Sequence, residues 1–173
     1  QLGSLASLAG VTIGEDGSNN TVIAKEVLQS RAFLADFIRQ HQLEAPLMAT
    51  EAWNNRQKEW VYDRKIYNPE TGEWGTDEDG ESLRPTDWDL VKTFRENHLK
   101  VSENKDNGMV TVSVKSLSPI AARQWTEWLV KDINEHMRTQ DVEEAEASIN
   151  YLEAKLNETN IAGMQQVFYQ LIE

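Results

Sequence analysis

The clearest hydrophobic pattern lies in residues 21–43, where apolar side chains recur every three or four positions. This spacing places them on one side of an α-helix. The polar cluster at 19–21 supplies a candidate N-cap, and Pro46 follows the pattern as a stop signal. The pattern predicts one amphipathic helix of about six turns. Its apolar face consists of Ile23, Val27, Phe33, Leu34, Phe37 and Ile38.

Two further elements are predicted between residues 84 and 116. The stretch RPTDWDLVKTFREN has Thr86 as a candidate N-cap and predicts a capped helix. The inward residues of this helix are Leu90, Val91 and Phe94. In HLKVSENKDNGMVTVSVKS, valines alternate with polar residues after Asn107-Gly108, a pair that tolerates the positive φ of a tight turn. This stretch predicts a β-hairpin.

The C-terminal part is predicted to contain two helical stretches. Ser118-Pro119 opens the first, because proline at the first helical position loses no hydrogen bond. The face of this stretch consists of Ala121, Trp125, Leu129, Ile133 and Met137. The second starts near Asp141 and carries a heptad-like seam, which consists of Val142, Ala145, Ile149, Leu152 and Leu156. The pattern slips around Asn160 and Gly163, which predicts a kink or a restart there.

Residues 44–85 are rich in tryptophan, charge and turn signals, and they predict a loop-dominated excursion with one short hairpin. So few strands are not stable alone. Partner strands are therefore expected from residues 1–15, from 44–75, or from sequence before Gln1, where a strand would pair with 109–115. The predicted fold class is α+β. A small mixed sheet packed with helices forms a base over residues 1–138, and residues 141–173 start a long helix that extends from this body.

Both ends of the sequence suggest that it is a piece of a longer protein. The last residues, MQQVFYQLIE, keep apolar side chains at helical spacing with no glycine or asparagine cap. The first residue, Gln1, is not an initiator methionine. We therefore expect further sequence on either side, including a surface that covers the last apolar residues.

Composition narrows the classes of partner. The formal net charge of −12 disfavours non-specific nucleic-acid binding and docking on an anionic lipid surface, since both need basic clusters. The absence of cysteine excludes disulfides and thiolate metal sites. The longest small-apolar tract, LASLAGV, is far shorter than the roughly 20 residues of a membrane span.

Most enzyme templates fail on this sequence. It has no P-loop and no G-x-S-x-G motif, and His41, His98 and His136 lack a second ligand at metal-binding spacing. Each histidine is interpreted as a polar surface residue near a helix end. The stretch 75–86 imitates part of a calcium loop without its first and twelfth ligands, so an acidic turn is expected. Acidic pairs such as Glu70 with Glu73, or Asp87 with Asp89, are frequent by chance in so acidic a chain. We predict no catalytic residue, no metal and no cofactor.

The tryptophans are the more informative set. The polar stretch contains Trp53, Trp60, Trp74 and Trp88. Exposed indoles stack well on sugar rings, so these residues are candidates for contact with a glycan or a partner. The competing and more frequent interpretation is that they anchor an irregular segment to the body.

Several stretches, in this order, resemble the periplasmic domain of bacterial polysaccharide co-polymerases, the Wzz-type chain-length determinants. They are LGSLASLAG, AKEVLQSRAFLADFIRQHQLEAPL, RPTDWDLVKTF, GMVTVSVKSLSPIAARQWTEWLVKDINEHMR and EAEASINYLEAKLNETN. The most specific features are the strand, the S-P-x-x-A turn and the W-x-x-x-L-x-x-x-[IL]-N helix that follows. The resemblance covers nearly the whole chain apart from the tryptophan-rich excursion.

The resemblance implies a fold and a function. Such proteins have an α/β base in the periplasm, a long helical hairpin above it, and two inner-membrane helices, which would lie outside this chain. They assemble with copies of themselves and set the length of a lipid-linked glycan, such as lipopolysaccharide O-antigen, made by a separate polymerase. They are not known for catalysis and use no cofactor.

Three alternatives stay open. The chain can be the periplasmic domain of a protein related to these determinants that also carries a cytoplasmic tyrosine autokinase and controls capsule or exopolysaccharide export. It can be a carbohydrate-binding module built on the tryptophans. It can also be an enzyme that uses a carboxylate pair, which would show turnover by this chain alone.

Overall fold

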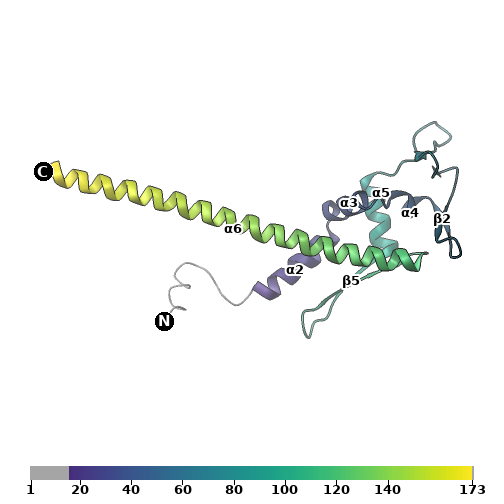
Figure 1. Ribbon diagram of the computed structural model, residues 1–173, viewed down its shortest axis with the longest axis horizontal. Helices are drawn as coiled ribbons and strands as arrows, with labels where there is room; N and C mark the ends of the chain where they lie inside the picture. The colour runs from purple at the N-terminus through teal and green to yellow at the C-terminus, as the bar shows by residue number, and fades with distance from the viewer. Residues whose placement is uncertain (1–15, 173) are drawn as a thin grey trace. The chain divides into compact units, whose positions relative to one another are not determined.

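The computed structural model describes residues 16–172. The chain divides into two compact units, one that ends at Ile133 and one that begins at Asn134. Unit 1 holds the short helices, the hairpins and the start of the last helix, α6, which continues into unit 2 (Figure 1). The predicted α+β fold class is confirmed.

The first predicted helix is divided in two, α2 (Asp16–Gln29) and α3 (Arg31–Gln40). The break is at Ser30, whose backbone is extended and whose hydroxyl accepts a 3.3 Å hydrogen bond from the Phe33 amide. Serine offers its side chain to the backbone in this way, and therefore it starts a new helix here. Because α2 already begins at Asp16, the predicted cap at 19–21 was wrong.

The tryptophan-rich stretch is more ordered than expected. It contains the short helix α4 (Glu44–Met48) and two antiparallel hairpins instead of one. The first hairpin pairs β1 (Thr50–Asn54) with β2 (Glu59–Tyr62), and the second pairs β3 (Tyr67–Asn68) with β4 (Glu73–Trp74). Asparagine side chains close both turns: Asn54 accepts from the Arg56 and Gln57 amides, and Asn68 accepts from the Glu70 amide.

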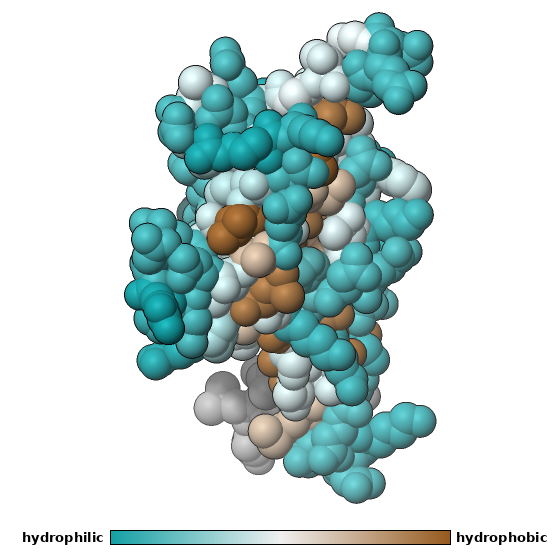
Figure 2. All heavy atoms as spheres, turned by 90° about the vertical axis from the view of Figure 1, so that its right-hand side faces the viewer, coloured by the Kyte–Doolittle hydropathy of each residue, from teal (hydrophilic) through white to brown (hydrophobic). Residues whose placement is uncertain are grey.

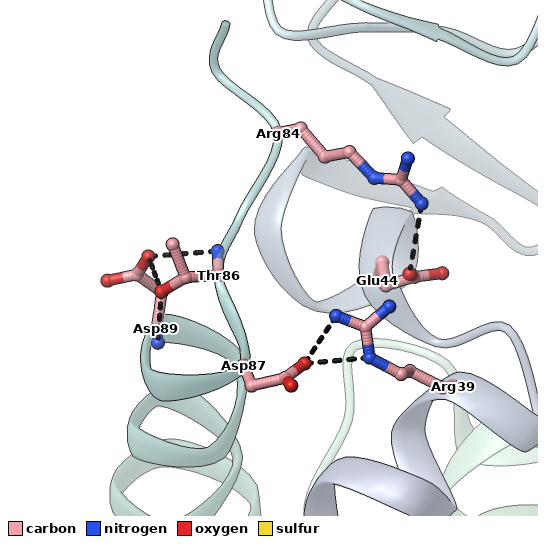
Figure 3. Close-up of polar contacts among 6 residues, drawn as sticks. All are labelled: Arg39, Glu44, Arg84, Thr86, Asp87 and Asp89. Atoms are coloured by element: carbon pink, nitrogen blue, oxygen red, sulfur yellow. Dashed lines mark hydrogen bonds and ion pairs between the residues drawn. The ribbon is translucent and has the colours of Figure 1, made fainter.

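The predicted helix at 87–94 is confirmed as α5 (Asp87–Thr93), followed by one π-helical turn, η2 (Phe94–His98). Thr86 is its N-cap in a reciprocal capping box with Asp89 (Figure 3). The Asp89 amide donates to the Thr86 hydroxyl, and Asp89 Oδ2 accepts from the Thr86 amide at 3.1 Å. The predicted inward residues are buried: Leu90, Val91 and Phe94.

The predicted hairpin at 99–115 is confirmed as β5 (Leu99–Glu103) paired with β6 (Val110–Val114). Gly108 has the expected positive φ, at 69°, although the connection is longer than a two-residue turn. Within residues 16–172 the strands form three separate two-stranded antiparallel sheets, and β6 pairs with β5 alone. A partner strand from residues 1–15 would lie outside the described residues.

The last element, α6 (Pro119–Ile172), is one helix of 54 residues. It begins at Pro119 as predicted, and buried Ser118 accepts a hydrogen bond from the Ala121 amide. The prediction that a second helix starts near Asp141 and the predicted restart near 160–163 were wrong, because α6 is continuous. No proline lies after Pro119, and a single glycine such as Gly163 costs only about 1 kcal/mol in a helix. The described residues include no helix that is long and apolar enough to cross a membrane.

The core of unit 1 lies where α3, α5 with η2, and the first part of α6 meet. Phe94 is its central residue, with its ring centroid 5.7 Å from that of Phe37 and 6.3 Å from that of Trp125. The other large residues of the core are Leu34, Ile38, Leu90 and Leu129. The hairpins and α4 are therefore built around a helical core.

Candidate functional site

A cleft of about 720 Å³ lies in unit 1 among α4, the hairpins β1–β2 and β3–β4, and the first part of α6. Its walls are unusually aromatic: Trp53, Trp60, Tyr62, Tyr67, Trp74, Trp125 and Trp128. We call it the aromatic cleft. Figure 2 shows the end of the molecule that carries β2 and the beginning of α6, where apolar side chains are exposed between hydrophilic ones.

Strand pairing explains why these rings gather. Trp53 lies directly opposite Trp60 in β1–β2, and Tyr67 lies opposite Trp74 in β3–β4. Directly opposite residues point to the same face of a hairpin. The two indoles of β1–β2 meet edge to face with centroids 4.9 Å apart, and the rings of Tyr67 and Trp74 are 5.1 Å apart. Each hairpin thus presents a pair of aromatic rings.

Two contacts join these pairs to the rest of unit 1. Trp60 stacks on Trp125 of α6 at 6.1 Å with 25° between the ring planes, and Tyr62 meets Tyr67 at 5.3 Å. Trp125 is buried, whereas the hairpin rings are half-buried and keep part of their surface open. The hairpin aromatics therefore anchor the excursion and also line the cleft, so both interpretations of the tryptophans describe part of the structure.

Polar groups surround the rings. The Glu44 carboxylate and the Arg84 guanidinium lie 3.8 Å apart at the cleft, with Arg84 reaching toward α4 from the segment before α5 (Figure 3). Other polar residues of the lining include Gln42, Gln124 and Lys58. Together these groups supply both donors and acceptors of hydrogen bonds.

A second ion pair lies close to Glu44 and Arg84 but does not line the cleft. Both Arg39 Nε and Nη2 approach Asp87 Oδ1, and the Nε distance is 2.7 Å (Figure 3). The hydrogen bond to Asp87, followed by its charge, raises the pKa of Arg39 above its usual value. This pair holds the end of α3 against the beginning of α5.

Two features of the cleft are electrostatically unusual. Trp53 Nε1 is buried and has no hydrogen-bond partner. An unpaired buried donor costs free energy, about 1–3 kcal/mol in typical cases. Burial raises the pKa of the Tyr62 hydroxyl to about 12, with a smaller contribution from Tyr67. Both residues belong to the first hairpin.

His41 also lines the cleft, but its ring is already engaged. Its Nε2 is 2.7 Å from Asp132 Oδ2, and the ring stacks on Trp128 at 4.3 Å with 9° between the planes. Only 14% of the His41 side chain is exposed, so the interpretation of His41 as a surface residue was wrong. Because Asp132 occupies Nε2, the imidazole serves the packing of α3 on α6.

The structure separates Trp88 from the other three predicted tryptophans. Trp88 lines a different hollow with Arg31, Lys92 and Arg95, is 55% exposed, and has the Lys92 ammonium 4.8 Å from its ring centroid. Trp74 and Trp88 are close in the chain but lie on either side of the turn at 76–82. The spacing of the tryptophans alone does not reveal this separation.

Three of the four carboxylates in the predicted acidic pairs are engaged by other groups. Glu70 pairs with Arg64 at 3.0 Å, Asp87 pairs with Arg39, and Asp89 accepts from Thr86. In the stretch that imitates a calcium loop, Asp77 Oδ1 accepts from the Asp79 and Glu81 amides, which closes an acidic turn. Among the residues that the structure describes, no group of His, Asp or Glu side chains is arranged to hold a metal ion.

Sequence reasoning missed half of the aromatic cleft. Trp125 was assigned only to a helix face, and Trp128, Tyr62 and Tyr67 were not named as candidate site residues. A signal for the tyrosines exists: in WVYDRKIY, Trp60 and Tyr62 alternate along one strand, so they share a face. Glu44 and Arg84, which are far apart in sequence, carried no such signal.

Unit 2 carries a second candidate surface, on α6. The larger residues of the heptad-like seam, namely Val142, Ile149, Leu152 and Leu156, are between 52% and 63% exposed. Ala145 of the seam is exposed as well. Acidic residues flank the seam, among them Glu143, Glu146 and Glu153. The seam is therefore an exposed apolar stripe between acidic residues on α6.

Comparison with protein-family models, with curated proteins and with solved structures finds no match for this chain.

Proposed function

We propose that this chain is the periplasmic part of an oligomeric, non-catalytic regulator of polysaccharide chain length, similar to the Wzz-type determinants of lipopolysaccharide O-antigen. It would act at the bacterial inner membrane with a separate polymerase and a lipid-linked glycan. The ordered sequence resemblance motivates this proposal. The structural observation that carries it is the exposed apolar seam of α6.

The occupant proposed for the seam is the same seam of a second copy. A heptad-like spacing matches an equivalent helix better than a flat surface, because its side chains fit between those of another helix with the same spacing. The acidic flanks of the seam and the net charge of −12 on the whole chain oppose this contact at low ionic strength. Assembly therefore depends on salt and on local concentration, which membrane anchoring would raise.

The proposed mechanism needs no chemistry from the chain. Copies packed side by side through α6 present repeated surfaces of unit 1, and this array limits how long the polymerase keeps extending one glycan. The contacts of Glu70, Asp87 and His41 are compatible with this role, because each of these side chains has a structural partner.

The test uses the full-length gene in its host. The gene is deleted, and the strain is complemented with the wild type, with Leu152→Lys in the seam, or with Ala154→Lys on the opposite side of the same helix. Surface polysaccharide is then compared as a ladder on a gel. We expect deletion to replace the preferred length by a smooth, short-weighted distribution, and only wild type and Ala154→Lys to restore it. A ladder that deletion leaves unchanged would refute the proposal.

A further inference from the structure

We propose that the aromatic cleft is a binding site for a neutral glycan chain. The inference rests on the geometry of unit 1 and holds whether or not the protein sets polysaccharide length. It concerns a surface formed by residues 41–128, whereas the proposed function is carried by the seam of α6.

The rings supply the first part of the argument. One face of a pyranose ring is lined with C–H groups, which pack well against the negative face of an aromatic system. Trp60 and Trp74 are half-buried at the cleft. The ring of Trp60 packs against Trp125, and the ring of Trp74 packs against Tyr67. Rings held in place lose little conformational freedom when a ligand binds, which favours affinity.

The polar groups supply the second part. Sugar hydroxyls donate and accept hydrogen bonds, and planar side-chain amides and carboxylates match them in both roles. Gln42, Gln124 and Glu44 line the cleft together with Arg84. The Glu44–Arg84 contact, at 3.8 Å, is too long for a strong hydrogen bond, so both side chains keep capacity for a ligand.

Charge and size then restrict the ligand. Glu44 and Arg84 have opposite charges, and the Lys58 ammonium already donates to Asn55 Oδ1 at 2.9 Å. These lining groups therefore do not select a strongly charged ligand. The volume of 720 Å³ lies within the range of about 300–1,000 Å³ that is usual for small-ligand pockets. A short segment of a neutral oligosaccharide fits these limits.

A proline-rich peptide is the main competing ligand, because such peptides also dock on aromatic grooves. Because proline has no backbone N–H, such peptides offer acceptors but few donors of hydrogen bonds. The ring of amide, carboxylate and guanidinium groups around this cleft therefore favours the polyhydroxylated ligand.

The test is calorimetric titration of the purified chain with neutral oligomers of glucose, galactose, mannose and N-acetylglucosamine, and with a proline-rich decapeptide. Trp74→Ala removes a stacking surface and Gln124→Ala removes an exposed amide, and near-ultraviolet circular dichroism verifies that each variant is folded. Trp88→Ala, outside the cleft, is the matched control. We expect millimolar or tighter binding of at least one oligosaccharide, weakened about tenfold by Trp74→Ala and several-fold by Gln124→Ala, and unchanged by Trp88→Ala.

Three results would overturn the inference: no oligosaccharide binds at millimolar concentration, only the peptide binds, or Trp88→Ala weakens binding as much as Trp74→Ala. The cellular ladder separates this inference from the proposed function. If Leu152→Lys alters the ladder while the titrations show no sugar binding, the chain-length role stands and the glycan cleft fails. If sugars bind and the ladder does not change, the glycan cleft stands and the chain-length role fails.

Discussion

The imidazole of His41 and the carboxylate of Asp132 lie 2.7 Å apart although 91 residues separate them in the chain. Their side chains are only 14% and 13% exposed. Because a carboxylate only accepts hydrogen bonds, His41 Nε2 carries the donated proton. The contact fixes the end of α3 to α6 at the edge of the aromatic cleft.

Breaking this contact is expected to destabilise unit 1. His41→Ala removes the hydrogen bond and the stacking on Trp128, and we expect the free energy of unfolding to fall by about 2 kcal/mol. Urea unfolding of His41→Ala, Asp132→Asn and the double variant measures the coupling between the two residues. Additive effects of the two substitutions would show that the pair contributes nothing jointly.

The capping box of α5 is expected to make stability depend on pH in the acid range. The Thr86 hydroxyl, and then the Thr86 amide, lower the pKa of Asp89 by hydrogen bonding to its charged form. A lowered native pKa stabilises the fold above the unfolded pKa of about 3.9, and this contribution is lost as the pH falls through the lower native value.

The substitution Asp89→Asn removes the titrating carboxylate. We expect it to be less stable than the wild type at neutral pH and to approach the wild type as the pH falls below the native pKa of Asp89. Chemical unfolding at a series of pH values follows the difference. A difference that stays constant down to strongly acid pH would contradict the assignment.

Alkaline pH is expected to weaken the first hairpin through Tyr62. Its pKa is raised to about 12 by burial, so the unfolded chain releases the phenolic proton first, near pH 10. The stability that this residue contributes is complete below about pH 10 and is lost as the pH rises toward 12. The absorbance of phenolate, measured as a function of pH for the wild type and for Tyr62→Phe, follows this titration. The Tyr62→Phe variant should lack the absorbance step near pH 12.

The second hairpin depends on a position that accepts only glycine. A Cβ atom at Gly75 would collide with the carbonyl oxygen of Lys65, whose backbone is fixed by the hydrogen bond from the Gly75 amide to Ile66. We expect Gly75→Ala to lower the free energy of unfolding by about 2 kcal/mol. Gly163→Ala, in open space on a helix, is the control and should raise helix stability by up to about 1 kcal/mol. Thermal unfolding that shows equal effects would refute the steric argument.

Self-association through the seam is expected to increase with salt. Screening weakens repulsion between the acidic flanks, while the apolar contact between seams persists. Sedimentation analysis at rising salt should show growing association for the wild type and for Ala154→Lys, and none for Leu152→Lys. Association that decreases with salt would mean that the contact is ionic rather than apolar.

The sequence was sufficient where a local signal fixes an element. The Thr86 cap, the β5–β6 hairpin and the start of α6 at Pro119 each depend on residues within a few positions of one another. The break at Ser30 was missed because the apolar spacing continues through it, and periodicity does not register a side chain that caps the following helix.

The cleft was only partly predictable for a different reason. The tryptophans could be singled out by their number, but their grouping depends on strand register and on contacts such as Trp60 with Trp125, which join distant segments. The separation of Trp88 and the pairing of Glu44 with Arg84 arise from the path of the chain, which no spacing rule encodes.

The division of the strands into three independent hairpins has a consequence for how this protein can diversify. No ladder of hydrogen bonds joins β1–β2 or β3–β4 to β5–β6 in the described part of the chain. Insertions, deletions and new side chains in the first two hairpins therefore leave the register of the third unchanged. Sequence changes can therefore alter the lining of the cleft while the helical core stays the same, in the way that loops vary on a rigid scaffold.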